Sequence, residues 1–308
     1  MLNLSLVVLK YHEEAYMNDI RTDLALEVRE DMERRGEELS GVNVKHEKKK
    51  DILITTVTIE NERAAKAMRK SRGSYLTLEA PWVKWNAGEE ETIVEVLSEY
   101  IKELIPGRLR KSVLVVGLGN RQVTPDALGP WIVDRLCINK HYAKEGENTI
   151  SAIAPGVMAQ TGLETAELVK GVVEQTKPTA IIALDALAAR NVRRLNTTIQ
   201  LSDAGISPGS GVGNHRHAID YDTMKVPVIA IGIPTVVDAI TIVNDTMNKL
   251  LDAMQIEYEY LTESERRDLI LELLDPNLKT MFLTPKNVDE SIINMSDTIA
   301  NAICMAVL

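Results

Sequence analysis

Two aspartates in this sequence stand where their carboxyl groups can take part in acid–base chemistry. Asp126 lies in the segment Thr124–Gly129 (TPDALG), at the entrance of an expected helix, and Asp185 closes the apolar run IIALD. At one edge of a sheet, two such acids can form a pair in which one keeps a proton while the other activates water. Each also has a structural interpretation, as an acid favoured at a helix N-terminus by about 0.3–1 kcal/mol or as the charged end of a buried strand.

Two glycine-rich segments are further candidates for a site. Gly117–Asn120 (GLGN) has Gln122 where a dinucleotide fingerprint needs a third glycine, so a tight turn is favoured over nucleotide binding. Residues 208–214 (PGSGVGN) begin with proline where a nucleophile elbow needs glycine. We therefore interpret this second segment as a loop that shapes a cleft, in preference to a nucleophilic Ser210 beside a histidine base.

The sequence contains only weak signals for a metal or another cofactor. None of the five histidines forms the H-E-x-x-H pattern, and Cys137 and Cys304 lack zinc-site spacing. The cysteines predict two buried, reduced thiols. We expect no cofactor, although His215 and His217 leave a metal site in their loop open.

Composition excludes several classes of protein. The chain has 308 residues, with 35 Lys and Arg against 45 Asp and Glu, and only 4% aromatic residues. Nucleic-acid binding uses basic grooves and stacking platforms, so no direct nucleic-acid contact is expected. No apolar run reaches the ~20 residues of a membrane helix, and residues 2–9 lack the features of a signal peptide. These observations predict a cytoplasmic protein without membrane contact.

The elements that must position the two acids follow from hydrophobic periodicity. Continuous apolar runs separated by helical stretches predict a three-layer α/β fold with a doubly wound, mostly parallel sheet, and such a sheet binds ligands beyond the carboxyl ends of its strands. The expected strands of this core are 112–117, 150–154, 180–184, 197–201 and 226–231.

The preceding region predicts an α+β elaboration, and the C-terminal region predicts two long helices. The elaboration has strands at 51–60 and 75–79 and helices at 24–39, 61–70 and 89–104, with Lys48–Lys50 in a loop. An apolar stripe from Val236 to Met254 predicts a helix facing the core or another subunit. The last helix covers 288–307.

Several long blocks of this sequence resemble the germination proteases of spore-forming bacteria, across nearly the whole chain. The blocks are RTDLA (21–25), VGLGN (116–120), TPDALG (124–129), IAPGVM (153–158), ALAAR (186–190), NTTIQ (196–200), PGSGVGN (208–214), GIPTVVDA (232–239) and LTPK (283–286).

The resemblance implies an endopeptidase that initiates degradation of small acid-soluble spore proteins during germination, in the cytoplasm of the forespore or spore core. It implies a homotetramer made as a zymogen, with a fold similar to the hydrogenase-maturation endopeptidases. Asp126 and Asp185 match the family's proposed catalytic acids. We expect an aspartic-type hydrolysis without metal, in which one acid activates water and the other donates a proton.

The family's preference for a cut after an acid and before a hydrophobic residue and Ala points to Asp23–Leu24 as a self-processing site. Residues 1–23 would then be a pro-segment, and 24–308 a single protease domain with the elaboration at 24–110 and the core at 111–308. An acid before the bond also suggests a basic subsite, for which Arg190 is a candidate beside Arg193 and Arg194.

We place the oxyanion-stabilising N–H groups in the two glycine-rich segments, from their position in the sequence. The alternatives left open are a metal-dependent endopeptidase of the hydrogenase-maturation type and a non-catalytic nucleotide-binding or spore assembly protein. The named candidates for oxyanion donors are Gly119, Asn120, Gly211 and Gly213.

Overall fold

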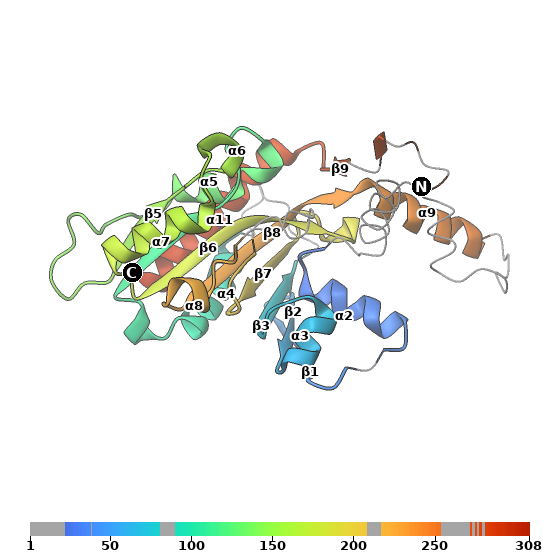
Figure 1. The fold of residues 1–308 in the computed structure, drawn as a ribbon, viewed down its shortest axis with the longest axis horizontal. Helices are drawn as coiled ribbons and strands as arrows, with labels where there is room; N and C mark the ends of the chain where they lie inside the picture. Colours follow the sequence, from blue (N-terminus) through green and yellow to red (C-terminus); the bar gives the residue numbers. More distant parts are fainter. Residues whose placement is uncertain are drawn as a thin grey trace, which may run out of the picture.

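A computed structural model describes residues 22–37, 39–80, 90–207, 217–253 and 281–308, together with 272, 275, 277 and 278. Its centre is one nine-stranded sheet in the order β1-β2-β3-β7-β8-β6-β4-β5, with β9 beside β8 (Figure 1). Helices cover both faces of this sheet, which confirms the predicted α/β class.

Parallel pairing is confined to four strands of the sheet. These are β4 (Ser112–Gly117), β5 (Thr149–Ile153), β6 (Ala180–Ala189) and β8 (Val228–Asp238). The strand β4 lies between β5 and β6, so the crossovers run in opposite directions from it, and the carboxyl end of β4 is a switch point of the sheet.

The other pairings are antiparallel, so the sheet as a whole is mixed. The predicted strand 197–201 belongs to this antiparallel part, because it pairs antiparallel with β3 on one side and with β8 on the other. The antiparallel strands are β1 (Val42–Lys49), β2 (Ile52–Ile59), β3 (Gly73–Glu79), β7 (Thr198–Ser202) and β9 (Phe282–Leu283).

The expected loop at Lys48–Lys50 is wrong for its first two residues, which end β1. β1 is a polar strand at the edge of the sheet, so its sequence lacks the apolar alternation by which strands are recognised. Lys49 and Lys50 form ion pairs with Glu99 and Glu95 of helix α4 (Glu90–Leu104). The basic run therefore ties the edge of the sheet to a helix.

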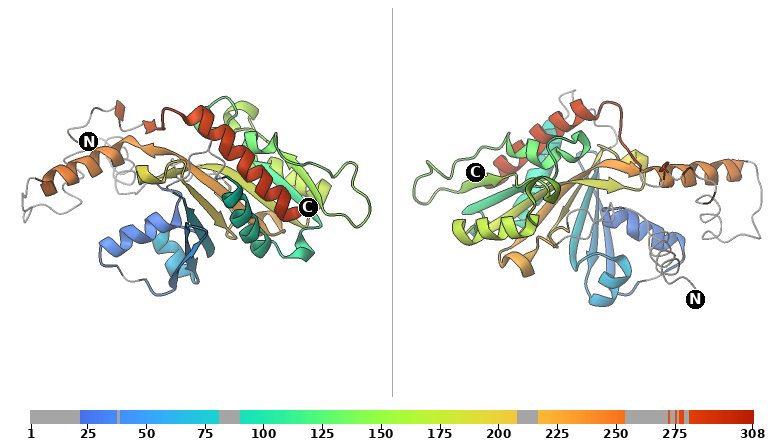
Figure 2. Two further views of the ribbon diagram at one scale, coloured as in Figure 1. Left: turned by 180° about the vertical axis from the view of Figure 1, so that it is seen from behind. Right: turned by 45° about the horizontal axis from the view of Figure 1, so that its top comes forward.

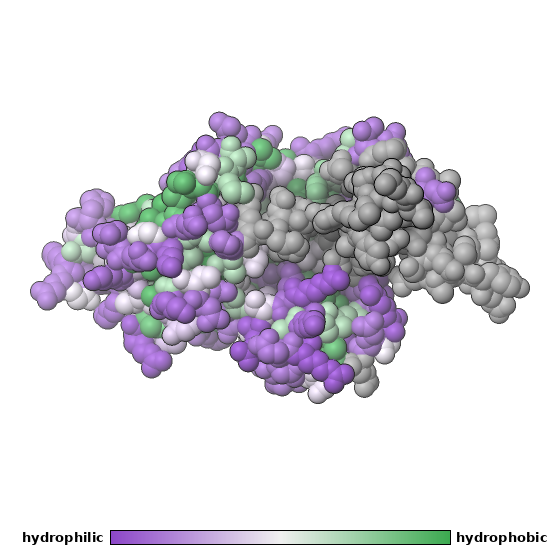
Figure 3. Space-filling model, viewed as in Figure 1, coloured by the Kyte–Doolittle hydropathy of each residue, from purple (hydrophilic) through white to green (hydrophobic). Residues whose placement is uncertain are grey.

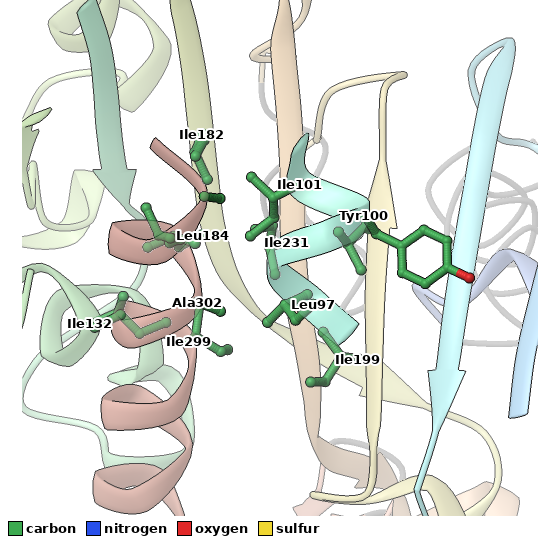
Figure 4. Packing of buried hydrophobic residues seen from close by; sticks show 14 of the residues in the cluster. Leu97, Tyr100, Ile101, Ile132, Ile182, Leu184, Ile199, Ile231, Ile299 and Ala302 are labelled. Carbon is green, nitrogen blue, oxygen red and sulfur yellow. The ribbon is translucent and has the colours of Figure 1, made fainter. Parts of the chain in front are cut away.

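One face of the sheet is covered by α4, α5 (Leu128–Val133) and α11 (Val288–Val307), as Figure 2 shows from behind. Their aliphatic side chains pack against alternate residues of the strands, since successive strand residues point to opposite faces. In Figure 4, Leu97 and Ile101 of α4 and Ile299 of α11 lie against the sheet residues Leu184 and Ile231.

The opposite face carries the remaining short helices. The buried residues Leu114 and Val116 of β4 point to this side and pack against α7, whereas Val113 and Val115 point to the α4 side. The helices are α2 (Ala25–Arg34) and α3 (Glu62–Met68) over β1–β3, and α7 (Thr165–Thr176) and α8 (Tyr221–Met224) over the parallel part. The short helix α6 (Met158–Thr161) precedes α7 and has no buried residues.

The expected helix from Val236 begins later than predicted. Val236 lies in β8, and the helix α9 covers Ala239–Ala253, while Met254 lies outside the described residues. In both views of Figure 2, α9 extends away from the rest of the molecule. No helix within the described ranges is long and apolar enough to cross a membrane.

The two cysteines are neighbours in space. The backbone N–H of Cys137 donates to Sγ of Cys304 at 3.1 Å, which joins α11 to the end of the α5 region. Cys304 is buried as expected, but Cys137 is exposed, so the prediction of two buried thiols is wrong for Cys137. Burial raises the pKa of the Cys304 thiol to about 12.

Two glycines allow the backbone of β4 to touch the start of α5. A Cβ on Gly117 would lie 2.3 Å from the carbonyl oxygen of Gly129, and a Cβ on Gly129 would lie 2.3 Å from that of Leu118. The glycine of GLGN that ends the strand therefore serves close packing, as the predicted tight turn requires. This contact fixes the segment between them, which contains Asp126.

Substituting Gly117→Ala should lower the free energy of unfolding by about 1–3 kcal/mol, because the new methyl group overpacks against backbone that cannot move aside. Gly171→Ala is the matched control: a Cβ there meets nothing within 4 Å in helix α7, and alanine should add about 0.8–1 kcal/mol through helix propensity. Urea unfolding of both variants measures this. Equal stability of the two would contradict the close contact.

Candidate active site

Asp126 lies at the carboxyl end of β4. It ends the 3₁₀ turn η2 (Thr124–Asp126), and its Oδ2 accepts a hydrogen bond from the backbone N–H of Asn120 at 2.7 Å. Thr235 of β8 donates its hydroxyl to the carbonyl of Pro125 at 2.6 Å, which fixes the turn from the other side. The carboxylate is thus folded back over the end of the strand, where the switch-point rule places a site.

Asp185 does not end its strand as expected, because β6 continues to Ala189. The strand that ends here is β4, whose last paired residue is opposite Leu184. Leu118 N donates to the Leu184 carbonyl at 2.8 Å, so Asp185 stands one residue beyond this last contact. It is 8% exposed. Asp185 therefore lies at the predicted edge of the sheet, but the strand that ends there is β4 and not β6.

The structure therefore brings the turn with Asp126 and the strand with Asp185 together. η2 contacts both β6 and β8, and the loop Leu118–Asn120 is bonded to Asp126 on one side and to the residue before Asp185 on the other. Two carboxylates at one strand end can share the roles of acid and base.

A row of three residues crosses the sheet at the level of Asp185. Asp185 is opposite Gly232 of β8, and Gly232 is opposite Gln200 of β7. Residues in register on neighbouring strands point to the same face, so Gln200 and Asp185 share a face, with Cα atoms roughly 10 Å apart at two strand spacings. Between them, the position of a Cβ on Gly232 is filled by the side chain of Leu187, 2.6 Å away.

The predicted processing segment lies on this face. Asp23 N donates to the Ala188 carbonyl at 2.8 Å, and Ala188 N donates to Asp23 Oδ2 at 2.9 Å. Leu24 is fully buried against Leu187, Leu195 and other apolar residues. The Asp23–Leu24 bond is thus seated three residues along β6 from Asp185.

The carbonyl of that bond has two side-chain donors. Lys70 Nζ donates to the Asp23 oxygen at 2.9 Å, and Gln200 Nε2 donates to the same oxygen at 3.1 Å. Gln200 also accepts from Ala25 N at 2.8 Å. Burial lowers the pKa of Lys70, and the charges of Asp23 and Glu27 oppose this effect.

Glu27, in the first turn of α2, is a buried carboxylate that holds the helix against the end of β6. It accepts from the backbone N–H groups of Arg190 at 2.6 Å and Asn191 at 2.8 Å, and the Thr22 hydroxyl also donates to it. Arg194 Nη1 lies 3.3 Å from Glu27 Oε1. Removal of these donors would leave the buried Glu27 carboxylate unpaired, which would destabilise the fold.

The arginines proposed for a basic subsite have acidic partners within the chain. Arg190 lies 3.1 Å from Asp31 and 3.8 Å from Asp245. Arg194 binds Glu30 and Glu79, and these bonds raise its pKa although burial acts to lower it. Arg193 is exposed. The role of Arg190 in binding substrate stays a prediction.

Of the candidates in the glycine-rich segments, the structure describes Gly119 and Asn120. Gly119 has φ +109° and its position for a Cβ is filled by the Asp126 carbonyl, and Asn120 N is engaged by the Asp126 carboxylate. Gly211, Gly213 and His215 lie outside the described residues, and His217 is exposed. In the part of the chain that the structure describes, no group of three His, Cys, Asp or Glu residues is arranged to hold a metal ion.

Apolar side chains flank the loop that carries Asn120. Gln160 of α6 donates to Asn120 Oδ1 at 2.7 Å, which brings α6 beside this loop. Val123, Met158 and Leu163 are exposed on the two segments. Figure 3 shows mainly hydrophilic residues on the described surface of this view, with hydrophobic residues on the side that carries α6.

Sequence reasoning missed Lys70, Gln200 and Glu27. Gln200 lies in the block NTTIQ, but its position opposite Gly232 depends on the antiparallel pairing of β7, which was not predicted. Lys70 follows a surface helix and has nothing in its sequence context that separates it from a solvated lysine.

Comparison with known proteins supports one family throughout. The family model described as germination protease (Peptidase_A25) matches residues 21–260. A germination protease of Caldanaerobacter subterraneus subsp. tengcongensis is 44% identical over 93% of this chain and 94% of its own length. Those of Clostridium perfringens and Bacillus mycoides are 42% and 39% identical, over 94% and 92% of this chain.

Among solved structures, the [NiFe] hydrogenase maturation protease HycI from Thermococcus kodakarensis KOD1 is 14% identical with a TM-score of 0.36, covering 66% of this chain and 98% of that chain. The family match extends over most of the sequence, and the relatives have nearly the same length. The chain therefore belongs to the germination protease family and is an endopeptidase of that family.

Proposed function

We propose that this protease degrades small acid-soluble spore proteins in the spore core at germination, and that Asp126 and Asp185 are its catalytic acids. One carboxylate takes a proton from water as the water attacks the peptide carbonyl. The other donates a proton to the leaving amine. The observation that carries this proposal is that both acids belong to segments bonded to the same short loop at the end of β4.

The burial of Asp185 supports a division of roles within the pair. Transfer of a carboxylate away from water favours its protonated form, and a second nearby negative charge acts in the same direction. Asp185 is 8% exposed and Asp126 is half-buried, and each accepts a backbone N–H bond, from Ala186 at 3.0 Å and from Asn120 at 2.7 Å. We assign the general base to Asp126 and the proton donor to Asp185.

We also propose that the chain is made as a zymogen with a pro-segment, residues 1–23, and that it cuts itself between Asp23 and Leu24, leaving 24–308 as a single protease domain. The contacts of Asp23 with Ala188 support this proposal, because they hold the bond on the face and near the strand position of Asp185. The hydroxyl of Thr22, which processing would remove, also donates to the Ala188 carbonyl at 3.3 Å, so the uncut segment can block the end of β6.

Self-association into a homotetramer is proposed to use helix α9. Ile240, Val243 and Met247 keep the predicted apolar spacing and are only half-buried, and Leu250 is 50% exposed. An apolar stripe on a helix that projects from the body (Figure 1) suits a second copy of the same chain.

Substitution of either acid should remove cleavage. Asp126→Asn and Asp185→Asn keep the shape of the side chain but cannot act as base or acid, so hydrolysis of a small acid-soluble spore protein should fall by about 10²–10⁴-fold. The matched control is Asp222→Asn, an exposed acid in α8. Cleavage is followed by mass spectrometry and folding by thermal unfolding. Undiminished cleavage by either folded variant would refute the assignment.

Self-processing should produce a chain that starts at Leu24. Incubation of the intact chain followed by intact-mass measurement should show loss of the first 23 residues. Asp23→Ala should slow this step, because it removes the carboxylate that accepts from Ala188 N. Asp222→Asn serves again as a control that keeps the site. A processed chain with a different first residue would rule out Asp23–Leu24 as the cut bond.

A further inference from the structure

The two donors to the Asp23 carbonyl oxygen are unusual because of where they come from. Lys70 follows helix α3 of the elaboration, and Gln200 belongs to β7 near the centre of the sheet. Both reach the same backbone oxygen, at 2.9 and 3.1 Å. Oxyanion-stabilising donors in proteases are found about 2.7–3.1 Å from the oxygen on which charge develops.

Lys70 is half-buried, and its ammonium group donates to two neutral carbonyl oxygens, that of Asp23 at 2.9 Å and that of Thr22 at 3.4 Å. Desolvation disfavours its charged form, as the lowered pKa of Lys70 reflects. A neutral donor would satisfy a resting carbonyl equally well. The ammonium gives a greater advantage once the oxygen carries a negative charge, as it does in the tetrahedral intermediate of peptide hydrolysis.

Gln200 holds the bond on both sides. Its Nε2 donates to the Asp23 oxygen and its Oε1 accepts from Ala25 N, one residue beyond the bond. Ala188 fixes the backbone and carboxylate of Asp23. With Leu24 sealed among apolar residues, the carbonyl has one orientation, with its oxygen aimed at the two donors.

We propose that Lys70 and Gln200 form the oxyanion hole for cleavage of the Asp23–Leu24 bond, so that they are catalytic residues in addition to the two acids. The inference rests on the proposed function, in which Asp126 and Asp185 carry out the hydrolysis and this bond is the one processed. It moves the oxyanion donors from the glycine-rich loops to two side chains.

The step balances without any further reactant. The water oxygen forms a bond to the Asp23 carbonyl carbon while one carboxylate of the acid pair takes the water proton. The carbonyl oxygen becomes an oxyanion held by Lys70 Nζ and Gln200 Nε2. The C–N bond then breaks and the second acid donates its proton to the Leu24 nitrogen. The products are the α-carboxylic acid of Asp23 and the amine of Leu24, and the acid pair keeps one proton, now on the carboxylate that acted as base.

The backbone N–H groups of the first glycine-rich segment are less suited to this role. Asn120 N already donates to the Asp126 carboxylate at 2.7 Å, so it orients an acid. Leu118 N donates to the Leu184 carbonyl. Lys70 and Gln200, in contrast, contact the carbonyl of the bond itself.

The test measures the self-processing rate of the full chain by intact mass. Lys70→Met and Gln200→Leu should each slow processing by about 100- to 1,000-fold, as expected when one oxyanion donor is removed. Lys66→Met, an exposed lysine one turn earlier in α3, is the matched control and should process at the rate of the unmodified chain. Thermal unfolding identifies any variant that fails to fold.

Lys70→Arg keeps the proposal testable if the methionine variant unfolds. Lys70 faces the carboxylates of Asp23 and Glu27, and processing should fall as the pH rises through the lowered pKa of Lys70, where the ammonium is lost. An arginine stays charged, so Lys70→Arg should process and should lack this alkaline decline. A lysine with only a packing role would not alter the pH profile in this way.

The possible outcomes separate the inference from the proposed function. Processing at Asp23–Leu24 at an unchanged rate in folded Lys70→Met and Gln200→Leu would overturn the oxyanion hole while leaving Asp126 and Asp185 as the catalytic acids. Unchanged processing in Asp185→Asn, or a different cut bond, would instead overturn the proposed function. Slow processing in both donor variants, with a normal rate in Lys66→Met, supports the inference.

Discussion

The early end of β4 is the constraint on which the site depends. β4 stops opposite Leu184, while β6 continues to Ala189 beside β8. Beyond this point, the backbone N–H and C=O groups on one edge of β6 have no neighbouring strand to pair with. Buried groups of this kind need partners. Acidic side chains supply most of them: Asp185 binds the N–H of Ala186, Asp23 binds Ala188, and Glu27 binds the N–H of Arg190.

One consequence is that the proposed processing site is bound to β6, the strand that carries the proposed catalytic residue Asp185. Asp23 completes the edge of β6, so the bond that follows it is drawn onto the sheet next to Asp185. Glu27 then anchors α2, through Arg194 as well as the backbone beyond β6. Removal of residues 1–23 would free the edge for the main chain of a substrate, which can bind an unpaired strand edge in the same way.

Much of the core could be predicted from the sequence. The apolar run 112–117 indicates a buried strand, and the apolar spacing in 288–307 indicates a helix with one buried face. The position of Asp126 at a strand end followed from the same pattern. The mixed sheet could not be predicted, because β1 is polar and the direction of β7 is set by long-range pairing with β3. The contacts of Lys70 and Gln200 with the Asp23 carbonyl could not be predicted, because the three residues lie far apart in the sequence.

The most direct test of this account is amide hydrogen exchange at Ala188. In a full chain carrying Asp185→Asn, which we expect to prevent the proposed processing, the Ala188 N–H should be strongly protected by the Asp23 carboxylate. Adding Asp23→Ala should raise its exchange rate and leave Ile182, in the centre of β6, unchanged. Equal protection of Ala188 in the two chains would show that Asp23 does not complete the edge of β6 and would contradict the account.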